Sequence, residues 1–154
     1  MRTALKVISV LIILAVAGIQ FVRPERTNPP VNRAETLEAN ASVPGEVTSI
    51  LERSCKDCHS NATEWPWYSN VAPLSWSVAE HVSHGREELN FSEWGTYNDE
   101  RRQRKLEEIC EEVTERQMPH PQYLWLHWDA ALSDKEIGII CRWTEASGND
   151  PGRR

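Results

Sequence analysis

Cys55-Lys56-Asp57-Cys58-His59 is the stretch of this sequence that most restricts its fold and its chemistry. It has the C-x-x-C-H spacing of a c-type haem attachment site. Two thiols three residues apart can reach the two vinyl groups at one edge of a porphyrin. The adjacent imidazole then lies beneath the iron, which accepts a histidine nitrogen readily. The pattern therefore predicts one covalently attached haem c, bonded through Cys55 and Cys58, with His59 as an iron ligand.

Two other kinds of site share part of this pattern. A lone C-x-x-C also occurs in redox dithiols and as half of a zinc site. Zinc would need two further ligands at suitable spacing, and the sequence has neither a second C-x-x-C nor an H-x₃₋₅-H, although His81 and His84 are close together. These two alternatives stay open, but an apolar N-terminal run typical of export and a predicted helix that ends at Cys55 both favour haem.

The ligand on the opposite side of the iron is predicted to be Met118, the only methionine besides Met1. It follows a predicted helix and precedes Pro119, which places it at the start of a loop. A thioether is a soft, neutral ligand, and Met/His ligation raises the reduction potential of haem iron. The alternatives are a methionine that fills a gap in the core, an open iron site, or a histidine. The candidate histidines are His81, His84, His120 and His127.

The N-terminus predicts export or membrane insertion. Arg2 and Lys6 precede an apolar run over 7–22, which is typical of a signal sequence or a short membrane anchor. Cleavage after Ala15-Val16-Ala17 would give a soluble periplasmic protein. Because the apolar run continues past Ala17, we favour an uncleaved, single-pass anchor in the bacterial cytoplasmic membrane, with the rest of the chain facing the periplasm.

The segment after this run is rich in proline and polar residues, which indicates an extended tether. The chain is then divided into four parts by the sequence alone. These are a signal or membrane anchor at 1–22, a Pro-rich polar tether at 23–44, a haem-binding domain at 45–147 and a flexible tail at 148–154.

Apolar residues at helical spacing predict four helices in the domain. The first begins near Ser42 and Pro44 and runs directly into Cys55. The last opens with the capping box Ser133-x-x-Glu136. The other two span about 75–85 and 99–117, and loops fill 60–74 and 119–132. No stretch alternates with period two, so the predicted fold class is all-α, a small cytochrome-c-like helical domain around one covalent haem behind an N-terminal hydrophobic helix.

Cys110 and Cys141 lie outside the haem motif, each on the apolar stripe of its predicted helix. They are either small buried hydrophobic residues or, in an oxidising compartment, a disulfide. We predict the disulfide, which would close a span of 31 residues. In the chain-entropy view, a bridge of this length contributes roughly 3–4 kcal/mol to stability.

The predicted domain is acidic. The whole chain has a net charge of −6, and residues 45–147 contain 10 Lys and Arg against 19 Asp and Glu, a net charge of −9. This argues against a nucleic-acid partner, since phosphate binding needs basic patches. It fits a redox partner with a basic docking face, although a simply solvated acidic surface has the same composition. Seven Trp residues in so short a chain suit the lining of a flat apolar ligand, although ordinary core and surface positions account for any one of them equally well.

Several motifs together resemble those of bacterial haem-binding-domain proteins, a group of c-type cytochrome-like proteins. The resemblance covers 23–144. It is carried by Arg23-Pro24, Asn28-Pro29-Pro30, Cys55-x-x-Cys58-His59-Ser60-Asn61, the run from Trp65 to Pro73, Gly85-Arg86, Leu89-Asn90-Phe91-Ser92-x-Trp94, Met118-Pro119, His127 and Trp143. It implies a mostly helical domain in the periplasm, often behind one membrane anchor. The haem residues of the family match Cys55, Cys58 and His59, and Met118 matches its Met-Pro position. Cys110 and Cys141 lie outside the pattern.

We interpret the sequence as that of a one-electron carrier in a periplasmic or membrane-associated redox chain, rather than an enzyme. One haem with two protein ligands and no evident catalytic acid or base makes a minimal redox relay. The alternatives are a peroxidase-like haem enzyme, in which His81 or His84 would supply a distal acid or base, and a haem-based redox or gas sensor. Both alternatives require an accessible iron, so the spin state and carbon monoxide binding would discriminate them from the carrier.

Overall fold

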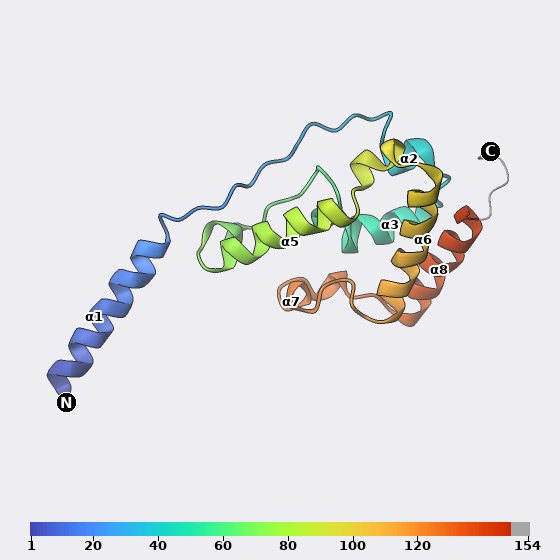
Figure 1. Cartoon of the computed structure of the whole chain (residues 1–154). Coiled ribbons are helices and arrows are strands. Elements are labelled where there is room, and N and C mark those ends of the chain that lie inside the picture. Colours follow the sequence, from blue (N-terminus) through green and yellow to red (C-terminus); the bar gives the residue numbers. More distant parts are fainter. Residues whose placement is uncertain (149–154) are drawn as a thin grey trace.

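The structure is a computed structural model that describes residues 1–148. Within this range the only regular elements are helices, which confirms the all-α prediction (Figure 1). Of the tail predicted for 148–154, only Gly148 lies within the described residues. The elements are α1 (Arg2–Ile19), α2 (Leu37–Asn40), α3 (Gly45–Ser54), α4 (Lys56–His59), η1 (Trp67–Asn70), α5 (Leu74–Glu88), η2 (Phe91–Thr96), α6 (Asp99–Thr114), α7 (Pro121–Leu124), η3 (Trp128–Ala130) and α8 (Asp134–Gly148), where η denotes a 3-10 helix.

The hydrophobic core lies where α6 and α8 pack side by side, with α3 against α8 (Figure 1). Leu37 of α2 and Phe91 and Trp94 of η2 also belong to it. Each helix contributes the apolar stripe that its sequence predicts, and its charged face points outward. The most deeply buried core side chains are Leu37, Val47, Trp94, Leu106 and Ile140. Cys110 of α6 and Cys141 of α8 are joined in a disulfide, as predicted, so the central helix pair is covalently linked.

The start of α8 shows the predicted capping box. The backbone N–H of Ser133 donates to the Glu136 carboxylate at 2.8 Å, and the Glu136 N–H donates to the Ser133 hydroxyl at 3.3 Å. Arg53 of α3 reaches the same carboxylate at 2.7 Å. The Glu136 carboxylate therefore satisfies the backbone N–H just before α8 and links that helix to α3.

The end of α6 differs from the prediction. The helix stops at Thr114 rather than at Gln117, because Arg116 adopts a left-handed conformation with a φ of 60°. The N–H groups of Gln117 and Met118 then donate back to the carbonyl of Glu112, at 3.0 and 3.2 Å. A left-handed residue followed by such back-bonds is a common way to end a helix, and here it directs the chain towards α7.

The segment predicted as a tether is extended, but it is bound to the domain. The Arg26 guanidinium donates to the Ser69 hydroxyl at 2.9 Å, and the Asn28 amide donates to the Thr63 carbonyl at 2.9 Å. Further on, Leu37 is only 1% exposed and belongs to the core. The packed part of the molecule therefore begins before Gly45, the residue at which the sequence placed the start of the domain.

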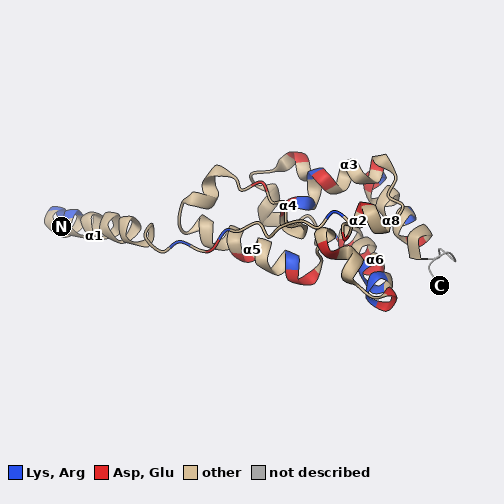
Figure 2. Ribbon diagram, turned by 90° about the horizontal axis from the view of Figure 1, so that it is seen from above, with Lys and Arg blue, Asp and Glu red and all other residues tan. Residues whose placement is uncertain are grey.

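α1 is long and apolar enough to cross a membrane, with a mean hydropathy of 2.1 and none of its residues buried against the rest of the protein. Figure 2 shows its charges gathered at the N-terminal end, with none along the remainder of the helix. A signal sequence has the same properties, so a membrane anchor and a signal sequence both fit this helix.

Candidate functional site

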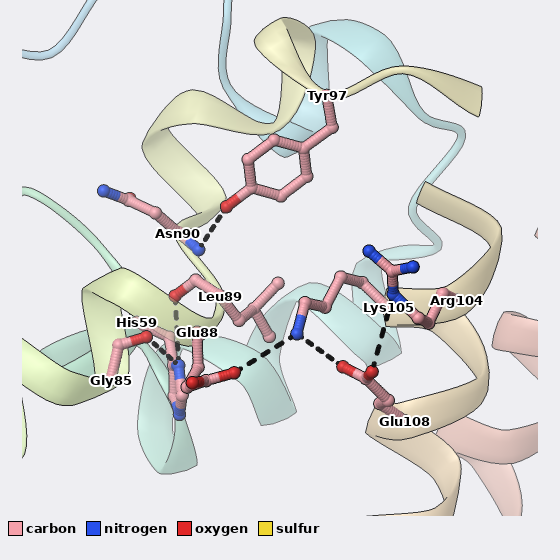
Figure 3. Close-up of polar contacts among 9 residues, drawn as sticks. All are labelled: His59, Gly85, Glu88, Leu89, Asn90, Tyr97, Arg104, Lys105 and Glu108. Carbon is pink, nitrogen blue, oxygen red and sulfur yellow. Dashed lines mark hydrogen bonds and ion pairs between the residues drawn. The ribbon is translucent and has the colours of Figure 1, made fainter. Parts of the chain in front are cut away.

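His59, the last residue of α4, has its ring held by two backbone carbonyls (Figure 3). Its Nδ1 lies 2.9 Å from the carbonyl oxygen of Gly85 and 3.1 Å from that of Leu89. Carbonyl oxygens only accept hydrogen bonds, so Nδ1 carries the proton and Nε2 keeps its lone pair free for a metal ion. Burial lowers the pKa of His59, which further favours the neutral ring that a metal requires.

The approach of α5 to α4 depends on Gly85. A Cβ atom at this position would lie 2.7 Å from the carbonyl oxygen of Cys58 and 3.2 Å from its Cβ atom. Real Cβ atoms do not come so close to a backbone oxygen, so any larger residue would push α5 away from the motif. Because Gly85 has no side chain, α5 lies close enough for the Gly85 carbonyl to form a hydrogen bond with His59.

An ion-pair network crosses from α5 to α6 beside His59 (Figure 3). Lys105 is only 8% exposed, and its ammonium lies 2.5 Å from Glu108 and 3.5 Å from Glu88. A buried ammonium needs such partners because leaving it unpaired would be costly. The network fixes the end of α5, from which Leu89 offers its carbonyl to His59.

Cys55 and Cys58 are free, half-buried thiols. Burial raises the pKa of Cys55 to about 12 and that of Cys58 to about 11. Redox dithiols depend on a lowered thiol pKa, so this environment does not favour the dithiol alternative. Zinc also gains no support, because residues 1–148 bring no three His, Cys, Asp or Glu side chains together as a metal site.

Arg86 ties the residues after the motif to the rest of the fold. Its guanidinium donates to the Ser60 carbonyl at 2.8 Å and to the Thr63 hydroxyl at 2.7 Å. That hydroxyl in turn donates to the carbonyl of Asp57 at 2.6 Å. The sequence resemblance included Gly85-Arg86 but assigned these two residues no role, and the structure places Gly85 against the C-x-x-C-H motif and Arg86 against the residues that follow it.

An aromatic cluster connects the motif to α7 and η1. Tyr123 donates to the Asp57 carboxylate at 3.3 Å and stacks on His127, with ring centroids 4.1 Å apart. The Nε2 of His127 lies 2.6 Å from the hydroxyl of Tyr68. Burial raises the pKa of both tyrosines, so both remain neutral. Tyr68 lay within the run from Trp65 to Pro73 of the sequence resemblance, without a role, and Tyr123 was not singled out, because nothing in a sequence marks contacts so distant along the chain.

The other candidate ligands lie in different surroundings. Met118 is half-buried and packs against the same hydrophobic core as Cys55. His81 contacts His120, with ring centroids 4.6 Å apart, and His120 accepts a hydrogen bond from the backbone at the start of α7. His84 is exposed on α5. The role of Met118 as the opposite ligand remains a prediction.

An all-helical domain that presents two free thiols beside a histidine with an available Nε2 defines a small haem-binding protein. The model of the haem-binding domain family matches residues 14–146, and the chain belongs to this family. Neither a curated protein nor a solved structure matches the chain. The residues present fit a haem group, since Cys55 and Cys58 supply thiols and His59 supplies a neutral imidazole nitrogen.

Proposed function

We propose that this protein is a one-electron carrier with a single haem c attached through Cys55 and Cys58. The observation that carries the proposal is the orientation of His59, whose Nδ1 is held by two carbonyls beside the two free thiols. When bound, haem c supplies a ferrous–ferric couple that exchanges one electron at a time. The chain's contribution is to fix the ligands and to set the reduction potential.

Within this proposal, Met118 supplies the second iron ligand. It follows the left-handed turn at Arg116, which directs the chain out of α6, and it packs on the same core as Cys55. A neutral thioether stabilises the reduced state relative to the oxidised state, so the potential is raised. Bound to the iron, the Met118 thioether would also keep oxygen and peroxide from it, which suits a carrier rather than a catalyst.

The pair formed by Tyr68 and His127 favours the peroxidase-like alternative. Their 2.6 Å contact joins two groups that can exchange a proton, and a distal catalyst needs such a group. His81, the candidate acid or base from the sequence, instead packs against His120. The carrier remains the better proposal because these side chains already have partners. Tyr68 is hydrogen-bonded to His127, which stacks on Tyr123, and the Tyr123 hydroxyl donates to Asp57 of the motif.

For location, we propose that α1 stays in the cytoplasmic membrane and that the haem domain faces the periplasm. The disulfide between Cys110 and Cys141 supports an oxidising compartment outside the cytoplasm. Acidic segments lie on α3, α5 and α6 (Figure 2), and the net charge of −9 over 45–147 suits a redox partner with a basic docking face.

Covalent attachment is tested by extraction with acidified acetone, which should leave the haem on the polypeptide. Cys55→Ala and Cys58→Ala should each retain at most one thioether bond and yield less holoprotein. Haem that is freely extracted from the unaltered chain would overturn the assignment of haem c.

The ligand assignment is tested by substitutions at Met118. Met118→His should keep the iron six-coordinate but lower the reduction potential, and Met118→Ala should admit carbon monoxide and create some peroxidase activity. Ile109→Ala is the control, because Ile109 packs against the same core but has no ligating atom. If Met118→Ala has the spectrum and potential of the unaltered protein, Met118 is not a ligand, and the four candidate histidines are tested next.

A further inference from the structure

An exposed apolar patch lies where α1 meets the haem domain. It has two parts, the chain just beyond α1 and the η1–α5 corner, and Trp67 is its most exposed tryptophan at 76%. We refer to these six residues as the junction patch. They are Phe21, Val22, Trp67, Val71, Leu74 and Trp76.

Hydrogen bonds hold the two parts of the junction patch together. The Gln20 side chain accepts from the Ala72 N–H at 2.9 Å and donates to the Ala72 carbonyl at 3.1 Å. The Trp76 indole N–H donates to the carbonyl of Val22 at 2.7 Å. Figure 1 shows the N-terminal end of α5 next to the C-terminal end of α1. The patch is therefore fixed relative to the helix that would enter the membrane.

The charges around the junction patch differ from those of the rest of the domain. Residues 15–24 and 65–76 contain no Asp or Glu, whereas 45–147 as a whole has a net charge of −9. Arg23 follows the apolar part, and Arg26 donates to Ser69 within the same corner. Tryptophan and aliphatic residues flanked by arginine are the composition of a segment that lies at an anionic bilayer surface.

We propose that the junction patch inserts into the interfacial layer of the bilayer that α1 enters, so that the haem domain lies against the membrane surface. The proposal rests on the anchor of the proposed function. Lipid is the proposed partner because the junction patch begins directly after the membrane helix, and hydrogen bonds join its two parts there. Leu74 of the patch lies eleven residues before Gly85 on α5, or about 16 Å along the helix.

The experiment uses the full-chain holoprotein in vesicles of phosphatidylcholine and phosphatidylglycerol that contain a phospholipid with a diazirine near the glycerol end of one acyl chain. After illumination, mass spectrometry locates the labelled residues. Label should appear on α1 and on 67–76 and stay at background on α6. Label on α1 with only background on 67–76 would overturn the docking, while the anchor itself would stand.

Substitutions then test whether the apolar side chains cause the labelling. Trp67→Ser combined with Leu74→Ser should lose the label on 67–76 and keep it on α1, whereas Trp125→Ser should change neither. Trp125 is the matched control because it is 78% exposed but lies just after α7. Unchanged label on 67–76 in the double variant would contradict the proposal. The haem spectrum of each variant confirms folding, and absent haem c or absent label on α1 would count against the proposed function instead.

Discussion

The ring of His59 takes its orientation from main-chain atoms, and Gly85 is the residue that brings one of them close enough. Gly85→Ala should destabilise the protein by about 1–3 kcal/mol, the usual cost of forcing an extra methyl into a packed contact. The added Cβ would lie 2.7 Å from the Cys58 carbonyl oxygen and would displace α5. Urea unfolding measures the stability, and the ratio of haem to protein should fall because the Cys58–His59 segment shifts.

Gly138→Ala provides the matched control for Gly85→Ala. Gly138 also lies within a helix, but its nearest neighbour is the terminal Nη1 of Arg142 at 3.3 Å, which can move aside. Alanine is a better helix former than glycine by up to about 1 kcal/mol, so this variant should be unchanged or more stable. Equal stability of the two variants would show that a Cβ atom at position 85 does not disturb the packing of α5 against Cys58.

At the residue scale, the part of the site that could be predicted is the part that is local in the sequence. Cys55, Cys58 and His59 are contiguous, and their spacing alone indicates haem attachment. The carbonyl partners of His59 lie 26 and 30 residues away. A backbone carbonyl is common to every residue, so no side-chain pattern marks it. For the same reason Gly85 appeared only as part of a family motif, without a role.

At the scale of elements, helix starts were predicted better than helix ends. α8 begins as expected because Ser133 and Glu136 form a local signal. α6 ends early because arginine, at Arg116, occupies a left-handed position where glycine or asparagine is usual. α5 continues to Glu88, three residues beyond Gly85, where the sequence placed its end. Gly85 allows a close contact between helices and does not end the helix. The sequence alone does not reveal which of these two roles a glycine has.

The capping box of α8 should make the free energy of unfolding depend on pH in the acidic range. Hydrogen bonds from Ser133, and then Arg53, hold the pKa of Glu136 at about 2, below its usual value of 4.5. A lowered pKa means that the stabilisation is complete above pH 4.5 and is lost as the pH falls towards 2. Glu136→Gln should therefore cost about 1 kcal/mol at neutral pH, with the difference shrinking across that window. Chemical unfolding at several pH values measures this difference.

Glu145→Gln is the control for Glu136→Gln, since it removes an exposed charge from the same helix. It should change the unfolding free energy little at any pH in this window. A difference between Glu136→Gln and the unaltered protein that stays constant down to pH 2 would contradict the role of the Glu136 charge in the cap.

The disulfide between α6 and α8 should stabilise the protein mainly by restricting its unfolded state. Replacing Cys110 and Cys141 together by serine should lower the unfolding free energy by roughly 3–4 kcal/mol, from the 31-residue separation. The haem spectrum should be retained, because both cysteines lie outside the C-x-x-C-H motif. Alkylation of the denatured, unreduced protein should label neither cysteine, and two labelled cysteines would contradict the bond.

At the scale of the whole molecule, the extended course of the segment after α1 was predictable, but its attachment to the domain was not. Proline and polar residues indicate an extended chain, yet the same composition allows a free or a bound segment. Here the bonds are made by amide and guanidinium groups, as in the contacts of Asn28 with Thr63, Trp65 and Arg86. Such contacts leave no apolar period in the sequence. The domain is consequently held close to the end of α1.

If Asn28 fastens this segment, then Asn28→Ala should release it. The substitution removes the bonds of Asn28 to Thr63, Trp65 and Arg86, each contributing about 1 kcal/mol net. Trypsin cleaves only the released segment, so its rate tracks how often the segment detaches. Cleavage after Arg26 should become at least about tenfold faster, since ~1.4 kcal/mol corresponds to a factor of ten. Asn32→Ala is the control, because the Asn32 side chain accepts a hydrogen bond from the N–H of Ala34, two residues further on. Equal cleavage after Arg26 in both variants would mean that Asn28 does not hold the segment.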